Sequence, residues 1–278
     1  MATKPEDTNS DRRVTTRELI AMKQRGEKIA ALTCYDFLFA RLFAGSAIDV
    51  ALVGDSLGQV VLGYDSTIPV TVDEMIHHAS AVRRGLRGPL LVVDMPFLSY
   101  QVSTEQAMEN CGRVIKESGA EAVKLEGGDE RTVATIQALV TAGVPVMGHL
   151  GLTPQSVHQF GGYGVRGRET AEAERIETSA RQLQDAGCFG LVLEMVPTPL
   201  AARVSESIEI PTIGIGAGPQ CDGQVLVLPD MLGLNEGFNP RFLRRFAALA
   251  PDARQGIADF ARAVKEGEYP GDQESYGD

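Results

Sequence analysis

Carboxylate side chains stand at the ends of short apolar runs in this sequence, where they could bind a cation. The run "VALVGDSLG" (residues 50–58) passes from apolar residues to Asp55 and Ser56, and the run "LLVVDMPF" carries Asp94. Neither aspartate has a Cys or His pair close to it in the sequence. Such hard oxygen ligands suit an ion like Mg²⁺, which keeps open positions for substrate oxygens, better than they suit zinc.

A lysine and a glutamate in the run "AVKLEGG" form a second candidate pair. Lys124 and Glu126 are two residues apart, so in a strand their side chains project to the same side. The lysine could pair with a substrate carboxylate, and the glutamate could hold a metal-bound water. The alternative is a structural salt bridge between the two side chains, and the sequence leaves both interpretations open.

Two further runs carry residues that could move a proton. His149 lies between glycines in "VPVMGHLG", where a structural and a catalytic histidine are equally good interpretations. Glu194 interrupts the apolar run "LVLEMVP", and burial there is expected to raise its pKa toward the useful range of a general base. His77 and His78 fall in the middle of an expected helix and are interpreted as surface or packing residues.

The elements that must position these side chains are short apolar strands. Eight apolar runs with few charges before their ends occur along the chain, as expected for parallel strands covered on both sides. They span residues 29–36, 50–58, 90–97, 122–128, 144–151, 191–197, 210–218 and 224–231. Several end in polar residues, which include Asp36 and Asp230. An isolated aspartate at such a position more often caps the next helix or makes a turn.

Helical patterns separate the runs. Predicted helices occupy residues 15–26, 71–86, 103–119, 130–143, 169–187 and about 240–266. Capping-box spacing occurs at Thr15 with Glu18 and at Thr71 with Glu74. The "GIGAG" stretch follows the seventh run and lacks GxGxxG spacing, so a dinucleotide fold is disfavoured. We predict an α/β fold, a single (β/α)₈ TIM barrel with an extra N-terminal helix and C-terminal helices.

In such a barrel the ends of the strands converge on one rim, which carries the active site. This convergence explains why the apolar runs stop on charged residues. The barrel domain is predicted over residues 15–278, after a loose tail at 1–14, because no linker-like change in composition interrupts the chain.

Composition excludes several classes of function. A net charge of −11 argues against binding to nucleic acid, which requires a basic surface. No apolar run reaches the roughly 18 residues needed to span a membrane, and the polar first residues lack the apolar segment of a signal peptide. Four widely spaced cysteines indicate neither a zinc site nor a disulfide framework. Reduced thiols and a cytoplasmic location are therefore expected.

The motifs together resemble the ketopantoate hydroxymethyltransferase family, also called 3-methyl-2-oxobutanoate hydroxymethyltransferase. The resemblance covers roughly residues 15–266, with the motifs in the family's order. It is carried by "VGDSLG", "YDSTIPVT", "DMPF", "AVKLEGG", "GHLGLTPQSV", "GGYGVRGR", "LEMVP" and "IPTIGIGAGPQCDGQVLVLPDMLGL".

The resemblance implies transfer of a one-carbon unit from 5,10-methylenetetrahydrofolate to C3 of 3-methyl-2-oxobutanoate. The product would be 2-dehydropantoate, a precursor of pantothenate and coenzyme A. The family assembles as a homodecamer, a pentamer of dimers. The residues that contact the folate are not marked in this sequence.

Roles carried over from the family fall on the charged ends of the runs. Asp55 and Asp94 would hold one Mg²⁺ per subunit that chelates the substrate, and Glu126 would lie near the metal through water. Substrate-binding roles fall on Asp55, Ser56, Asp94, Lys124 and His149. Glu194 would be the catalytic base.

Two other functions compete with this one. A lyase or mutase of the phosphoenolpyruvate/isocitrate lyase kind would use the same barrel and Mg²⁺, but its lyase members carry a "KKCGH"-type loop that this sequence lacks. A metal-binding scaffold without activity would have broken site positions, whereas every position here is filled.

Overall fold

A computed structural model describes residues 13–277 of the chain. The chain divides into two compact units, one ending at Val227 and the other beginning at Leu228. The predicted tail lies almost entirely outside the described residues, and the prediction of one domain over 15–278 stays a prediction. Among the described residues, no helix is both long and apolar enough to cross a membrane.

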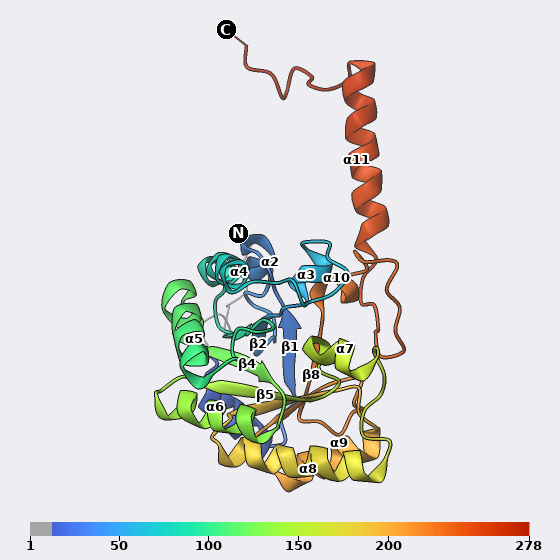
Figure 1. The fold of residues 1–278 in the computed structure, drawn as a ribbon. Helices are drawn as coiled ribbons and strands as arrows, with labels where there is room; N and C mark the ends of the chain where they lie inside the picture. The colour runs from blue at the N-terminus through green and yellow to red at the C-terminus, as the bar shows by residue number, and fades with distance from the viewer. Residues whose placement is uncertain (1–12, 278) are drawn as a thin grey trace. The chain divides into compact units, whose positions relative to one another are not determined.

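The first unit is built on a closed barrel of parallel strands (Figure 1). Each strand pairs with the next along the chain, and β8 closes the ring by pairing with β1. The strands are β1 (Ile29–Thr33), β2 (Val50–Val53), β3 (Leu90–Asp94), β4 (Ala122–Glu126), β5 (Val146–Gly151), β6 (Gly190–Glu194), β7 (Thr212–Ile215) and β8 (Gly223–Leu226). Six of them fall inside the predicted runs, and β6 and β8 each begin one residue before theirs, so the predicted barrel is confirmed.

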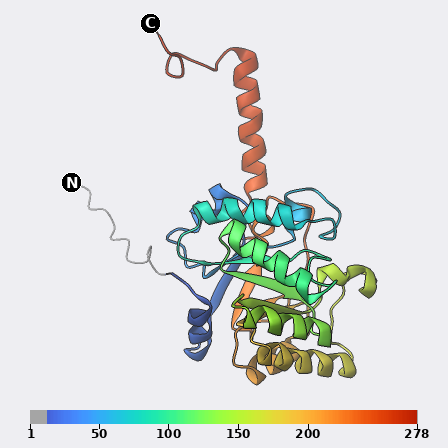
Figure 2. The ribbon, with the colours of Figure 1, turned by 60° about the vertical axis from the view of Figure 1, so that its left-hand side comes forward.

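Helices cover the outside of this barrel (Figure 2). Those of the first unit are α1 (Thr16–Gln24), α2 (Phe37–Leu42), α3 (Leu57–Val60), α4 (Val72–Gly85), α5 (Thr104–Ser118), α6 (Glu130–Thr141), the 3₁₀ helix η1 (Pro154–Ser156), α7 (Val157–Phe160), α8 (Thr170–Asp185) and α9 (Thr198–Ser207). The capping box of Thr71 and Glu74 is present at the start of α4, and α5 is capped at its C-terminal end by Gly119, whose φ of 74° suits glycine.

The second unit contains α10 (Leu228–Met231) and α11 (Leu249–Glu266). The predicted C-terminal helix is therefore shorter than expected, because residues 240–248 lie outside it. Pro251 gives the physical reason. Proline lacks a backbone N–H and fits only the first turn of a helix, so this helix begins two residues before it.

The inside of the barrel changes character along the strands. One apolar cluster fills its lower part and includes Leu90 and Val92 of β3, Ala122 of β4, Met147 of β5 and Val192 of β6. Side chains two residues further along a strand point to the same face. The next inward positions are therefore Asp94, Lys124, His149 and Glu194. The fold places a charged layer directly above an apolar one.

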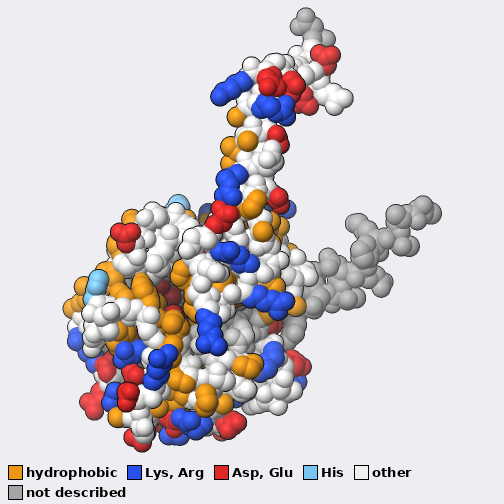
Figure 3. All heavy atoms as spheres, turned by 90° about the vertical axis from the view of Figure 1, so that its right-hand side faces the viewer, with side chains coloured by type: hydrophobic (Ala, Val, Ile, Leu, Met, Phe, Trp, Pro, Cys, Tyr) orange, Lys and Arg blue, Asp and Glu red, His pale blue; other side chains and the backbone are white. Residues whose placement is uncertain are grey.

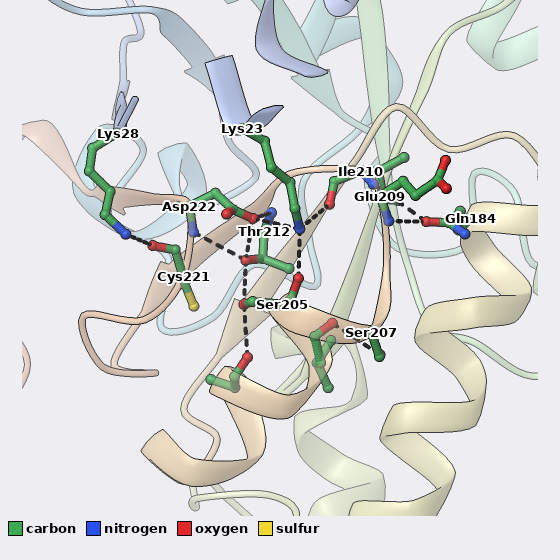
Figure 4. A network of polar contacts seen from close by, with 12 residues as sticks. Lys23, Lys28, Gln184, Ser205, Ser207, Glu209, Ile210, Thr212, Cys221 and Asp222 are labelled. Atoms are coloured by element: carbon green, nitrogen blue, oxygen red, sulfur yellow. Dashed lines mark hydrogen bonds and ion pairs between the residues drawn. The ribbon is translucent and has the colours of Figure 1, made fainter. Parts of the chain in front are cut away.

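Helix α1 closes the lower end of the barrel. Its Leu19 and Met22 belong to the same apolar cluster as the strand residues. Beside them, Lys23 Nζ lies 3.0 Å from Asp222 Oδ2 and donates to the backbone oxygens of Ser205 and Ile210 at 2.7 and 3.0 Å (Figure 4). This lysine therefore ties the extra N-terminal helix to the segments that enter β7 and β8.

Replacing Lys23 with methionine should lower the free energy of unfolding by about 2–4 kcal/mol, because Asp222 and two carbonyl groups lose their cation in a mostly buried place. The methionine retains the apolar stem, so the loss reports the ammonium group. Urea denaturation measures the difference. Lys116→Met, at an exposed position of α5, is the control and should change stability by less than about 0.5 kcal/mol. Equal effects of the two substitutions would contradict the role of Lys23 in holding α1 to the segments that enter β7 and β8.

Candidate active site

Strand register brings the charged side chains into pairs. Asp94 at the end of β3 lies opposite Lys124 of β4, and Glu126 lies opposite His149 of β5. All four side chains are buried. Because the strands are parallel, these residues lie at the C-terminal end of the barrel, where active sites of this fold form.

Lys124 forms the closest contact of the cluster. Its Nζ donates to Asp94 Oδ1 at 2.6 Å and lies 3.7 Å from Glu126 Oε1. Burial works to lower the pKa of Lys124, but the charges of Asp94, Glu126 and Asp55 outweigh it and raise this pKa. Lys124 is therefore a cation. The predicted salt bridge with Glu126 is the longer of its two contacts, and Asp94 is the nearer partner.

Asp55 follows β2 and is 4% exposed. Its Oδ2 accepts a hydrogen bond from Gln155 Nε2 at 3.0 Å. Burial raises the pKa of Asp55 well above its usual value, and the negative charges of Asp94 and Glu126 raise it further. Burial also raises the pKa of Asp94, despite the nearby Lys124. Carboxylates crowded in this way form a place where positive charge is stabilised.

His149 lies between two carboxylates. Its Nδ1 is 3.2 Å from Glu126 Oε1, and its Nε2 is 3.4 Å from Glu194 Oε2. Neither contact has hydrogen-bond geometry, so the attraction is one of charge. Burial and Lys124 oppose protonation, but the two carboxylates prevail and raise the pKa of His149 to about 9. At neutral pH the ring is an imidazolium, which cannot accept a proton.

Glu194 ends β6 and is less buried than predicted, with its side chain 17% exposed. Its backbone is held tightly. Glu194 O accepts from Leu152 N at 2.9 Å, and a Cβ at Gly151 would collide with that same oxygen. The next residue, Met195, has a φ of 46°, which is strained for a residue other than glycine. The Glu194 carboxylate points toward the charged layer, where its Oε2 lies 3.4 Å from His149 Nε2.

The other residues singled out in the sequence lie outside the charged layer or beside it and make different contacts. Ser56 is half-buried, and its Oγ lies 2.8 Å from the Tyr35 hydroxyl. Asp36, one of the polar run ends, caps α2 by accepting from Phe39 N at 2.9 Å. His78 contacts Tyr35 O through Nδ1 at 2.7 Å, which agrees with the packing role predicted for it. All four cysteines are buried and free.

The sequence matches the family model described as ketopantoate hydroxymethyltransferase over residues 13–272. This chain belongs to the ketopantoate hydroxymethyltransferase family. The 3-methyl-2-oxobutanoate hydroxymethyltransferase of Caldicellulosiruptor saccharolyticus is 52% identical over 95% of this chain and 99% of that protein. The enzyme of the same name from Moorella thermoacetica is 53% identical over 95% of this chain and 98% of its own length.

Among solved structures, this ketopantoate hydroxymethyltransferase family member shares its fold with distant proteins. 2,3-Dimethylmalate lyase, a member of the PEP mutase/isocitrate lyase superfamily, has a TM-score of 0.59 and 18% identity, covering 94% of this chain and 91% of that one. Phosphonopyruvate hydrolase, solved with oxalate and Mg²⁺, has a TM-score of 0.60 and 12% identity over 94% and 93%. Proteins with the competing lyase-type function thus have the same barrel fold. The family match distinguishes this chain from them.

The donor set of this site fits Mg²⁺. No group of three or more His, Cys, Asp or Glu side chains within residues 13–277 could hold a metal ion alone. Mg²⁺ is commonly bound by one or two carboxylates, with water and substrate oxygens in its other positions. Asp55 and Asp94 supply such a pair. Buried Glu126 Oε1 has no hydrogen bond within the described part of the chain, which fits a role in binding a water molecule of the metal ion.

Sequence reasoning missed three polar residues of this site. Gln155 and Tyr100 are both buried beside the charged layer, and the Tyr35 hydroxyl contacts Ser56. The only signal available was position. Tyr35 stands in the run "IAALTCYD" next to Asp36, and Gln155 stands in "GHLGLTPQSV" six residues after His149. Neither residue type titrates near neutral pH, so a search for charged strand ends passes over them.

Proposed function

We propose that this protein transfers a hydroxymethyl unit from 5,10-methylenetetrahydrofolate to C3 of 3-methyl-2-oxobutanoate. The products are 2-dehydropantoate and tetrahydrofolate, and the atom balance requires one water, which supplies the hydroxyl oxygen. The proposal rests on the match to the hydroxymethyltransferase family over residues 13–272. It places the enzyme in the biosynthesis of pantothenate and coenzyme A, in the cytoplasm.

Charge balance supports a divalent cation as the cofactor. Within residues 13–277, the carboxylates of Asp55, Asp94, Glu126 and Glu194 face two cationic groups, those of Lys124 and His149. One Mg²⁺ per subunit, on Asp55 and Asp94 with Glu126 near it through water, would balance the excess of negative charge. Bound Mg²⁺ supplies Lewis-acid stabilisation of negative charge that develops on the keto oxygen.

The residues of the chain do the remaining work. The Lys124 ammonium binds the substrate carboxylate, and Ser56 and the imidazolium of His149 line the substrate position. Water adds to the methylene carbon of the folate, and both of its bonds to folate nitrogens break as the two protons of the water pass to those nitrogens, which leaves the carbon at the oxidation level of formaldehyde. Glu194 accepts the C3 proton, and the electron pair left on C3 attacks this carbon. The carbon–carbon bond forms as the C=O π pair moves onto the oxygen, which takes up the proton and becomes the product hydroxyl.

Product formation tests the whole proposal. Purified protein with Mg²⁺, 3-methyl-2-oxobutanoate and 5,10-methylenetetrahydrofolate should produce 2-dehydropantoate, detected by mass spectrometry. A protein that releases no 2-dehydropantoate but cleaves 2-oxo or 2-hydroxy diacids would favour the lyase alternative. Absence of turnover on either substrate class would favour a metal-binding scaffold.

Replacing Lys124 with methionine should raise KM for the oxo acid by about 10–100-fold, the worth of a hydrogen bond to a charged group. The lysine neutralises a carboxylate present in both the ground and the transition state, so binding is affected as much as chemistry. KM for the folate should change less. Steady-state kinetics with each substrate varied makes the comparison. An unchanged KM for the oxo acid, together with a lower melting temperature, would assign Lys124 to a structural pair with Asp94.

Helix α11 supports association with further copies of the chain. Ile257, Phe260 and Val264 recur at helical spacing on it and are 70%, 59% and 46% exposed, and Figure 3 shows hydrophobic side chains along this helix. Exposed apolar stripes of this kind commonly mark interfaces between protein chains. We propose that α11 packs against other subunits in the decameric assembly expected for the family.

The double substitution Ile257→Glu and Phe260→Glu should therefore shift the protein from a decamer to smaller species, because charges would be buried in the interface. Sedimentation velocity measures the assembly size. Arg262→Glu on the same helix is the control for added negative charge, since its side chain lies among exposed acidic partners. A wild-type protein that sediments as a monomer would contradict the proposed assembly.

A further inference from the structure

Gln155 joins the ends of four strands in one buried network. It lies in η1, directly after β5, and is 5% exposed. Its side-chain Nε2 donates to Asp55 Oδ2 at 3.0 Å and to Met95 O at 2.8 Å. Its backbone N–H donates to Glu126 Oε2 at 3.1 Å. These contacts reach residues that follow or end β2, β3 and β4.

The amide of Gln155 is also held from its oxygen side. Oε1 accepts from the Tyr100 hydroxyl at 2.9 Å and from Gln101 Nε2 at 3.1 Å. Tyr100 in turn accepts from the backbone N–H of Glu126 at 3.1 Å. Both hydrogens and both lone pairs of the amide are therefore used, which is the full capacity of a glutamine side chain.

This arrangement determines which way the amide points. Met95 O can only accept, so the NH₂ group must face it, and the same group then donates to Asp55. The oxygen faces Tyr100 and is turned away from the carboxylates. Gln155 is therefore placed to orient the carboxylate oxygens of Asp55 and Glu126, and it does not itself offer an oxygen to a cation.

We propose that Gln155, held by Tyr100, is the positioning residue that presents Asp55 and Glu126 to the divalent cation. The inference rests on the proposed metal-dependent function and deepens it. Groups that hydrogen-bond to metal ligands fix the direction of those ligands, and their loss typically costs 10–100-fold in metal affinity or activity. Here the side-chain amide directs Asp55 and the backbone N–H of the same residue directs Glu126, so a substitution of the side chain should disturb Asp55 while the backbone contact with Glu126 remains.

Mn²⁺ serves as the probe, because its binding can be followed directly by paramagnetic resonance or calorimetry without turnover. Gln155→Leu keeps the volume and removes every side-chain hydrogen bond. It should weaken Mn²⁺ binding by about 10–100-fold. Tyr100→Phe removes only the hydroxyl that holds the amide, so it should weaken binding less, by about 2–10-fold. The graded order of the two variants is the expected signature.

A matched control separates positioning from stability. Thr212→Val removes a fully buried hydroxyl that contacts Ser205 Oγ at 2.6 Å and Asp222 Oδ2 at 3.0 Å at the lower end of the barrel. It should lower the melting temperature by about as much as Gln155→Leu, a few degrees, and leave Mn²⁺ affinity unchanged.

Two results would overturn the inference, and they are distinguishable. Wild-type protein that binds Mn²⁺ tightly, together with a folded Gln155→Leu variant of equal affinity, would assign Gln155 to stability alone. Wild-type protein that binds no Mn²⁺, even with 3-methyl-2-oxobutanoate present, would contradict the proposed function itself and the positioning role with it.

Discussion

Replacing Glu194 with glutamine should slow the exchange of the C3 proton of 3-methyl-2-oxobutanoate by about 10²–10⁴-fold, the usual worth of a general base. The substitution keeps the size of the side chain and removes its basic oxygen. Proton removal precedes the reaction with folate, so exchange can be followed in heavy water without folate by nuclear magnetic resonance. Affinity for the oxo acid should stay within a few-fold, because Lys124 still binds its carboxylate.

The rival base is His149, and the pH dependence of exchange separates the two. A base with the raised pKa of about 9 found for His149 would make the exchange rate climb as pH rises toward 9. An exchange rate that does not climb over this range would exclude His149 as the base. A Glu194→Gln variant that exchanges at the normal rate, and fails only when folate is added, would exclude Glu194 as the base. Glu177→Gln, on α8, controls for the loss of a carboxylate elsewhere.

The barrel was predictable because its strands are unusually uniform. Strands covered on both faces must be apolar along most of their length, so each one stands out from the helices around it. The common side of Lys124 and Glu126 followed from the alternation of side chains along a strand. The length of α11 was predicted less well, since the chain from 240 to 248 has helix-like composition but no helical structure.

The sequence indicated the charged residues of the candidate site, which interrupt apolar runs, but it did not indicate uncharged residues such as Gln155. Asp36 and Asp55 both follow an apolar run, yet one caps a helix and the other joins the charged layer. A carboxylate before a helix suits both roles, and only the packing of distant strands decides between them. Gln155 shows the same limit. Its contact with Asp55 spans 100 residues of sequence, so no local pattern could have indicated it.

Replacing either Asp55 or Asp94 with asparagine should weaken Mn²⁺ binding by more than about 100-fold, beyond the 10–100-fold cost of changing an outer residue. Asparagine keeps the shape of the side chain and removes the charge that attracts a divalent cation. Turnover should fall with it and be partly restored by excess Mg²⁺ or Mn²⁺. Removing metal from the wild-type protein with EDTA should stop turnover. Full activity of the double asparagine variant in metal-free buffer would end the metal assignment.

The raised pKa of Asp55 predicts how metal binding depends on pH. Burial and neighbouring carboxylates raise the pKa of Asp55 well above its usual value, so in the metal-free protein a proton competes with the cation for this site. Mn²⁺ affinity should therefore decrease as pH falls through that raised pKa, and binding should release protons. Calorimetry in buffers of different ionisation enthalpy counts the protons released. The Asp55→Asn variant should release fewer than the wild-type protein, whereas equal release would place the displaced proton on another group.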